Sequence, residues 1–318
     1  MRVLFAGTPS LAVPALERIA RAHQVVGVLT APDRPSGRGR APAPSPVKEA
    51  ACALGLTVMQ PARLDDAFRR EVAAVSPQVL VVAAFGRIFR REFLDLFPQG
   101  GINLHPSLLP RFRGPSPVSA VILAGDAETG VTIQRIALKF DTGDILAQER
   151  YPLTGTETTA SLTEALAERG AALMASVLAA IDTGTPPAPI VQNDAEATYC
   201  HVLKKEEGAV LWEESARVID RKVRAFDPWP RAATSISGES LLLLKSHVYP
   251  ATLGEDHDRP VSEMPGTVRA ADRAHGLLVR TGSGILAIER LQLQFKKAMD
   301  WRSYMNGHPE IIGARLGA

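Results

Sequence analysis

Gly-Ile-Asn-Leu-His-Pro-Ser-Leu-Leu-Pro, at residues 101–110, is the stretch that decides how this chain is organised. Apolar Ile and Leu alternate here with Asn103 and His105, which is typical of a β-strand. The two prolines that follow cannot continue a strand ladder, so we expect the strand to end near His105. Asn103 and His105 then leave the same face of one strand, two residues apart.

This pair of side chains suits acyl transfer if the strand belongs to an open α/β sheet. Ligands bind to such sheets at the carboxyl ends of the strands. There an amide N–H can steady a developing oxyanion, and a titratable ring can move a proton. Judged from these two residues alone, an ordinary polar turn is at least as good an interpretation.

The first half of the chain alternates strands and helices, as a parallel sheet requires. Residues 3–6 and 25–29 predict strands, and residues 10–19 between them carry apolar side chains at helical spacing. The apolar run at 79–84 predicts a central strand that is buried on both faces. We therefore expect a Rossmann-like, doubly wound, mostly parallel α/β sheet. The first turn has one glycine and no G-x-G-x-x-G pattern, which argues against a dinucleotide cofactor.

A proline-rich segment at residues 30–46 interrupts this rhythm. Counting from Asp33 to Lys48 gives four basic residues, Arg34, Arg38, Arg40 and Lys48, against one acidic residue. We expect a long, exposed loop with little regular structure. A solvated loop is one interpretation, and a contact to a phosphate backbone is the other.

Two further turns stand at predicted strand ends. Phe85-Gly86-Arg87-Ile88-Phe89 follows the central strand and could line a flat heteroaromatic ligand or simply pack against the core. Phe140-Asp141-Thr142-Gly143-Asp144 predicts a tight polar turn, in which aspartates are ordinary turn formers. Spacing alone does not bring Asp141 to His105.

Composition excludes several classes of protein. The 318 residues favour two domains, and no apolar run approaches the roughly 20 residues of a membrane span. The chain opens with a strand, so we expect no signal peptide. Cys52 and Cys200 lack metal-ligand spacing, and we interpret them as reduced core thiols of a cytoplasmic protein. With a net charge of +2, any nucleic-acid contact must come from a local patch.

The second half predicts a smaller β-domain after a linker. Residues 183–189 are rich in Thr and Pro, so we expect a catalytic domain at 1–183, a linker at 184–206 and a second domain at 207–318. Short strands are expected at 233–236, 241–246, 266–269, 276–280 and 284–291, which fits a small OB-like β-barrel. Lys296, Lys297 and Arg302 form a modest basic cluster near the end.

Several motifs together resemble the folate-dependent formyltransferases. The first two are Asn-x-His-Pro-Ser-Leu-Leu-Pro at 103–110 and Asp-Thr-Gly-Asp at 141–144. Within that group, the segments at 5–9, 32–39, 44–48, 125–132 and 224–230 are similar to the methionyl-tRNA formyltransferase family. The resemblance covers nearly the whole chain. It departs from the family at Gly114–Val118, at Ser119 and at Arg40-Ala41-Pro42, and these departures leave the Asn, His and Asp themselves unchanged.

The resemblance implies a fold and a reaction. A Rossmann-like formyltransferase domain would precede an OB-like domain that contacts initiator tRNA. The α-amine of the methionyl group on that tRNA would attack the formyl carbon of 10-formyltetrahydrofolate. Asn103 would donate to the oxyanion, His105 would shuttle protons or stabilise charge, and Asp141 would set the charge state of His105 and order water. No metal would be needed, because the formyl donor is already activated.

The resemblance also implies binding residues and partners. The folate co-substrate would lie against Phe85, Gly86, Arg87, Ile88, Phe89, Ser107, Leu108, Leu109 and Pro110. Charged initiator tRNA would be bound by Arg34, Arg38, Arg40, Lys48, Lys296 and Lys297, with no membrane contact and no obligate protein partner. Two alternatives remain: a formyltransferase that acts on a nucleotide-linked amino sugar, and a non-catalytic folate- or RNA-binding module.

Overall fold

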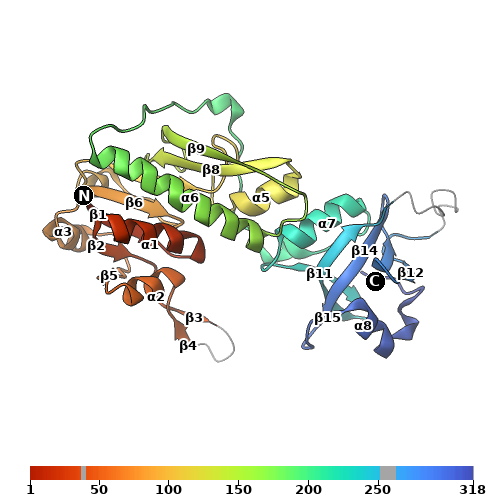
Figure 1. Cartoon of the computed structure of the whole chain (residues 1–318). Coiled ribbons are helices and arrows are strands. Elements are labelled where there is room, and N and C mark those ends of the chain that lie inside the picture. The colour runs from red at the N-terminus through yellow and green to blue at the C-terminus, as the bar shows by residue number, and fades with distance from the viewer. Residues whose placement is uncertain (37–40, 251–262, 318) are drawn as a thin grey trace. The chain divides into compact units, whose positions relative to one another are not determined.

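A computed structural model describes residues 1–36, 41–250 and 263–317 of the chain (Figure 1). The predicted tRNA residues Arg38 and Arg40 lie outside these ranges. The chain divides into two compact units. The first comprises Met1–Val118, Ala127–Leu153 and Ser161–Val202, and the second comprises Ser119–Asp126, Thr154–Ala160 and Leu203–Ala318. The domain limits at 183 and 206 stay a prediction.

A seven-stranded sheet forms the centre of the first unit. Its strands run in the order β5 (Val58–Met59), β2 (Gln24–Leu29), β1 (Arg2–Gly7), β6 (Val79–Ala83), β7 (Gly101–His105), β8 (Glu128–Arg135) and β9 (Ile145–Pro152). All pairs from β5 to β7 are parallel, whereas β8 and β9 are antiparallel. The predicted mostly parallel sheet is therefore confirmed.

Alternation along β1 shows why helices cover both faces of this sheet. Val3 and Phe5 point into one core, together with buried residues of α1 (Val13–Ala22), α2 (Pro46–Ala53) and α6 (Thr159–Asp182). Leu4 and Ala6 point into a second core, together with α3 (Asp66–Ala74) and the aromatic residues from Phe85 to Phe97. Figure 1 shows α1 and α6 on the same face. A strand that is apolar at every position is thus buried on both sides.

The remaining elements of the first unit are short. They are η1 (Ser10–Ala12), α4 (Arg91–Leu94), η2 (Asp194–Glu196) and the start of α5 (Pro117–Ala124). The basic segment, expected to be irregular, instead contains an antiparallel hairpin of β3 (Arg34–Ser36) and β4 (Ala41–Ala43). Pro35 faces Pro42 in this hairpin. Opposed residues in such a ladder alternate between hydrogen-bonded and non-bonded pairs, and residues without an N–H suit a non-bonded pair.

The second unit is built on an antiparallel sheet. Its order is β10 (Ala232–Ile236), β11 (Glu239–Val248), β14 (Ile285–Leu293), β13 (Gly276–Arg280) and β12 (Val268–Asp272), and β15 (Met299–Asp300) pairs with β14. The described pairings follow an open path from β10 to β12. A separate core joins this sheet to α7 (Ala216–Ala225), α8 (Trp301–Gly307) and η5 (Pro309–Ile311), and η3 (Lys205–Gly208) precedes α7. The predicted second β-domain is confirmed.

Within the described ranges, no helix has the length and apolar character that would let it cross a membrane. Both cysteines are free thiols. The expectation that both lie in the core is wrong for Cys52, which is exposed on α2, whereas Cys200 is half-buried. The spacing of apolar residues in a helix as short as α2 did not show which side chains face the core and which face solvent.

Candidate active site

Strand β7 places Asn103 and His105 on one face at the carboxyl edge of the parallel sheet. In the antiparallel ladder with β8, Asn103 lies opposite Gln134 and His105 lies opposite Thr132. Opposed residues project to the same face, so these four polar side chains gather at one point of the sheet edge. The predicted strand end at His105 is therefore where the site is built.

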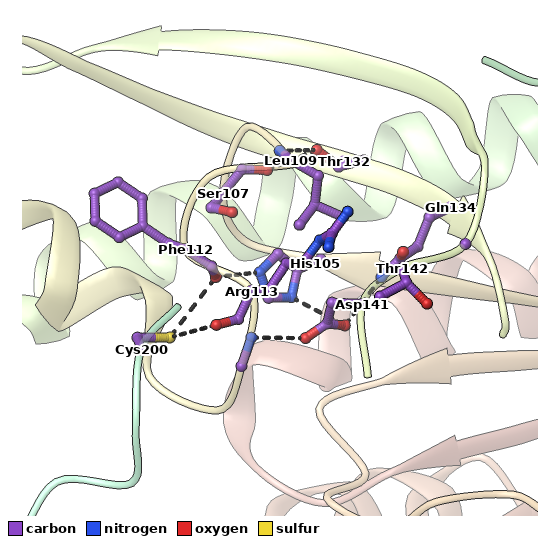
Figure 2. Close-up of polar contacts among 12 residues, drawn as sticks. His105, Ser107, Leu109, Phe112, Arg113, Thr132, Gln134, Asp141, Thr142 and Cys200 are labelled. Carbon is purple, nitrogen blue, oxygen red and sulfur yellow. Dashed lines mark hydrogen bonds and ion pairs between the residues drawn. The ribbon is translucent and has the colours of Figure 1, made fainter. Parts of the chain in front are cut away.

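The His105 ring is buried and lies between two hydrogen-bond acceptors (Figure 2). Its Nε2 atom is 2.9 Å from the Phe112 carbonyl oxygen, and its Nδ1 atom is 3.5 Å from Asp141 Oδ1. A carbonyl only accepts, so Nε2 must carry a proton. The Asp141 carboxylate faces the other ring nitrogen, so both nitrogens of His105 point at acceptor oxygens.

Asp141 reaches His105 from the turn before β9. Its backbone has a φ of +52°, which is costly for a residue with a side chain. Its Oδ2 atom accepts from the Gly114 N–H at 2.9 Å, and its Oδ1 atom accepts from Gln134 Nε2 at 3.0 Å. The carboxylate is thus held by two donors in addition to the ring. The structure brings Asp141 to His105, and its catalytic role stays a prediction.

The Asn103 amide is half-buried beside this cluster. Among the described residues, no hydrogen bond links its side chain to another group. Its N–H donors are therefore available to a substrate oxygen, which is what an oxyanion-binding amide requires.

The turn predicted to hold folate is partly a core element. Phe85 and Phe89 are buried and stack on each other, with ring centroids 5.4 Å apart. Arg87 donates from Nη1 to the Pro61 carbonyl at 3.0 Å. Gly86 and Ile88 are exposed, so a ligand at this turn would meet them rather than the two aromatic rings. The folate contact itself stays a prediction.

The second predicted folate segment, Ser107–Pro110, is held by a hydrogen bond to the residue that follows it and by another from β8. Ser107 Oγ donates to the Arg111 carbonyl at 2.7 Å, and Thr132 Oγ1 accepts from the Leu109 N–H at 3.1 Å. Leu108 and Pro110 are half-buried, and Ser107 and Leu109 are buried. Leu108 and Pro110 are therefore the members of this turn that retain surface for a ligand.

The predicted tRNA-binding residues that the structure describes differ in their surroundings. Arg34 belongs to β3, and Lys48 on α2 is paired with Asp33 at 2.6 Å. Hydrogen bonds from Gln60 and then from Lys48 hold the pKa of Asp33 below its usual value. Lys296 and Lys297 are exposed in the turn between β14 and β15. Their role in binding RNA stays a prediction.

Three functional candidates were missed from the sequence. Gln134 supports Asp141, and its position on the same face of a strand as Thr132 is a signal that could have found it. Arg113 and Gln192 lie in irregular segments, where no periodicity marks a residue that faces inward. Among the described residues, no group of three or more His, Cys, Asp or Glu could hold a metal ion.

Comparisons with known proteins agree with this geometry. Residues 1–178 match the formyl transferase family, and residues 202–309 match the formyl transferase C-terminal domain. The methionyl-tRNA formyltransferase of Treponema denticola is 42% identical over 322 residues, covering 98% of both chains. That of Roseiflexus castenholzii is 45% identical over 323 residues, covering 100% of this chain and 99% of its own.

A solved structure shares the fold at lower identity. An N-formyltransferase from Helicobacter canadensis, in complex with folinic acid and dTDP-3-aminofucose, has a TM-score of 0.65 and 19% identity. It covers 90% of this chain and 98% of its own. That likeness concerns the fold, whereas the full-length identities above 40% decide the family. The chain therefore belongs to the methionyl-tRNA formyltransferase family.

Proposed function

We propose that this chain transfers the formyl group of 10-formyltetrahydrofolate to the α-amino group of methionyl initiator tRNA. The product is formylmethionyl-tRNA, which starts translation in the cytoplasm. The observation that carries this proposal is the cluster of Asn103, His105 and Asp141, in a chain that matches methionyl-tRNA formyltransferases over its full length.

Asn103 is the oxyanion donor in this proposal. Attack of the amine on the formyl carbon turns the formyl oxygen into an oxyanion, and the free amide of Asn103 stands at the carboxyl edge to receive it. Removal of one such donor costs about 3–4 kcal/mol in transition-state stabilisation. The amide is already oriented by strand β7, so little reorganisation accompanies the reaction.

Of the two roles open to His105, general base and electrostatic stabiliser, the contacts of its ring support the second. A general base needs a ring nitrogen with a free lone pair, but Nε2 faces a carbonyl and Nδ1 faces a carboxylate. In this role the ring, held between its two acceptors, stabilises the anionic intermediate electrostatically. The attacking amine then loses its proton to water ordered near Asp141, and that water returns the proton to the departing folate nitrogen as its bond to the formyl carbon breaks.

The two predicted folate segments retain surface for a flat heteroaromatic ligand. Gly86 and Ile88 are exposed, and Leu108 and Pro110 are half-buried. The exposed cations Lys296 and Lys297, together with the basic segment from Arg34 to Lys48, would contact the phosphates of the tRNA. These contacts add to affinity and are sensitive to salt.

The test is formyl transfer from 10-formyltetrahydrofolate to methionyl initiator tRNA, with uncharged tRNA and free methionine as controls. A dTDP-linked amino sugar serves as the competing acceptor, because the solved relative from Helicobacter canadensis carries one. We expect transfer to the charged tRNA alone. Transfer to the amino sugar, or folate turnover without transfer to tRNA, would overturn the assigned acceptor.

A further inference from the structure

The segment from Gln192 to Cys200, expected to be part of a linker, lies against the stretch that supports His105. Arg113 pairs with Tyr199 in a parallel bridge. The Arg113 N–H donates to the Thr198 carbonyl, and the Cys200 N–H donates to the Arg113 carbonyl, both at 2.8 Å. Gly114 comes so close to this segment that an added Cβ would lie 2.2 Å from the Cys200 carbonyl oxygen.

Arg113 is the centre of this contact. Its side chain is only 1% exposed, and each nitrogen of its guanidinium donates to a residue of this segment. Nε and Nη2 donate to Gln192 Oε1 at 3.0 and 2.8 Å, Nη2 also donates to Asp194 at 2.8 Å, and Nη1 donates to the Tyr199 hydroxyl at 3.1 Å. Burial opposes the charge, but Asp194 and Tyr199 raise the pKa of Arg113. A fixed buried cation therefore anchors Gln192.

Gln192 passes this anchoring on to the Asp141 turn. Because Arg113 can only donate, Gln192 must present its oxygen to the guanidinium and its Nε2 atom to the other side. That nitrogen donates to the carbonyls of Asp141 at 2.9 Å and Gly143 at 2.7 Å, and it lies 3.3 Å from Gln134 Oε1. A turn with a positive φ at Asp141 persists only where its surroundings hold it.

Both acceptors of the His105 ring are thus held by one segment. The Phe112 carbonyl is fixed because the Phe112 N–H donates to Thr198 Oγ1 at 2.8 Å and the next residue pairs with Tyr199. Gln192 holds the backbone of the turn that carries the Asp141 carboxylate, through the carbonyls of Asp141 and Gly143. We propose that Arg113 and Gln192 are positioning residues that hold the two acceptors of His105 in place for formyl transfer. This inference rests on the proposed function for the reaction, although the geometry concerns the enzyme alone.

The experiment replaces Gln192 in two ways. Gln192→Ala removes both sides of the amide. Gln192→Glu keeps an acceptor for Arg113 but removes the N–H donors to the turn. Val191→Ala is the matched control, because this neighbouring side chain is 78% exposed. Arg113→Lys keeps the charge but loses the forked geometry, and it provides an independent variant.

Three readouts are taken on the full chain: kcat and KM for formyl transfer, thermal stability, and 15N NMR of the histidine rings. The His105 signals are identified by their absence in His105→Ala. Because the spectra are recorded without substrates, they report on positioning even if the proposed acceptor is wrong.

We expect kcat to fall about 10- to 100-fold in both Gln192 variants, as for other residues that orient a reacting group, with KM changed less than about threefold. The His105 ring signals should shift from their wild-type positions, because the ring loses its fixed acceptors, and Arg113→Lys should show a smaller change in the same direction. Val191→Ala should match the wild type. Unchanged ring signals with kcat within twofold of wild type would overturn the inference, and so would a loss of kcat that only follows the unfolded fraction.

Discussion

The carboxylate of Asp141 accepts the backbone N–H of Gly114 at 2.9 Å, which joins the turn before β9 to the stretch that follows the active-site strand. The same carboxylate also accepts from Gln134 and faces His105. Two donors and the His105 ring therefore converge on one side chain. An asparagine at this place has a single acceptor oxygen, so at least one donor would lose its partner.

Asp141→Asn is therefore expected to reduce kcat by roughly 100-fold or more and to cost about 1–3 kcal/mol of stability, the penalty of an unsatisfied buried donor. Steady-state kinetics and urea unfolding measure the two effects. Asp95→Asn, at the end of α4, makes the same chemical change away from this cluster and should match the wild type. An Asp141→Asn enzyme with near wild-type kcat would show that the charge at this position is not needed.

Phe295 gives a prediction about stability. This residue is 89% exposed and has a φ of +63°, a conformation that glycine adopts without strain. Phe295→Gly should raise the free energy of unfolding by about 1 kcal/mol, because the backbone strain is relieved and little packing is lost. Phe295→Ala keeps the strain, so it separates the backbone effect from the lost ring. Equal stabilities of the Gly and Ala variants in urea unfolding would refute the argument.

The two thiols should differ in reactivity. Cys52 is exposed, whereas burial raises the pKa of Cys200, whose sulfur accepts from the Ser116 N–H at 3.3 Å. A raised pKa keeps the thiol protonated, and the thiolate is the reactive form. Brief maleimide labelling near neutral pH, followed by peptide mapping, should modify Cys52 first. In urea the two sites should react at similar rates, and faster labelling of Cys200 in the folded protein would contradict this account.

Asp33 should make stability depend on pH in the acid range. Its pKa is lowered in the folded state by hydrogen bonds from Gln60 and Lys48, so the folded protein binds this proton more weakly than the unfolded chain does. Its contribution is therefore complete above about pH 5 and is lost as the pH falls below about 4. The stability difference between wild type and Asp33→Asn, measured by urea unfolding across this range, should shrink on acidification. A difference that grows would reverse the assigned sign.

Periodicity accounts for the part of the site that lies on strands. The alternation of Ile102 and Leu104 with Asn103 and His105 predicts one shared polar face, and β7 presents that face at the carboxyl edge. The apolar run at 79–84 likewise predicts the central strand β6, which spans Val79–Ala83. Period-two patterns are reliable here because a shift of one residue would turn every side chain to the opposite face.

Residues in irregular segments could not be placed in this way. Asp141 reaches His105 through a turn with positive φ, and only the family resemblance suggested that it would. Gln192 comes from a segment that was predicted as linker, because a chain without repeating structure gives no sign of which side chains face inward. Phe85 and Phe89 show a second reason why sequence alone is not enough. Aromatic residues at a strand end suit a ligand site and a core equally well, and here both rings are buried and stacked.

The central claim is that Asn103 and His105 perform the chemistry, and single-turnover formyl transfer to methionyl initiator tRNA tests it most directly. Asn103→Ala and His105→Ala should each slow transfer by roughly 100- to 1,000-fold. The melting temperature of Asn103→Ala should stay near that of the wild type, whereas His105→Ala should also lose some stability because its ring is buried. Asn306→Ala removes an exposed amide on α8 and should have no effect on the rate. Transfer within twofold of the wild-type rate in both Asn103→Ala and His105→Ala would contradict the account.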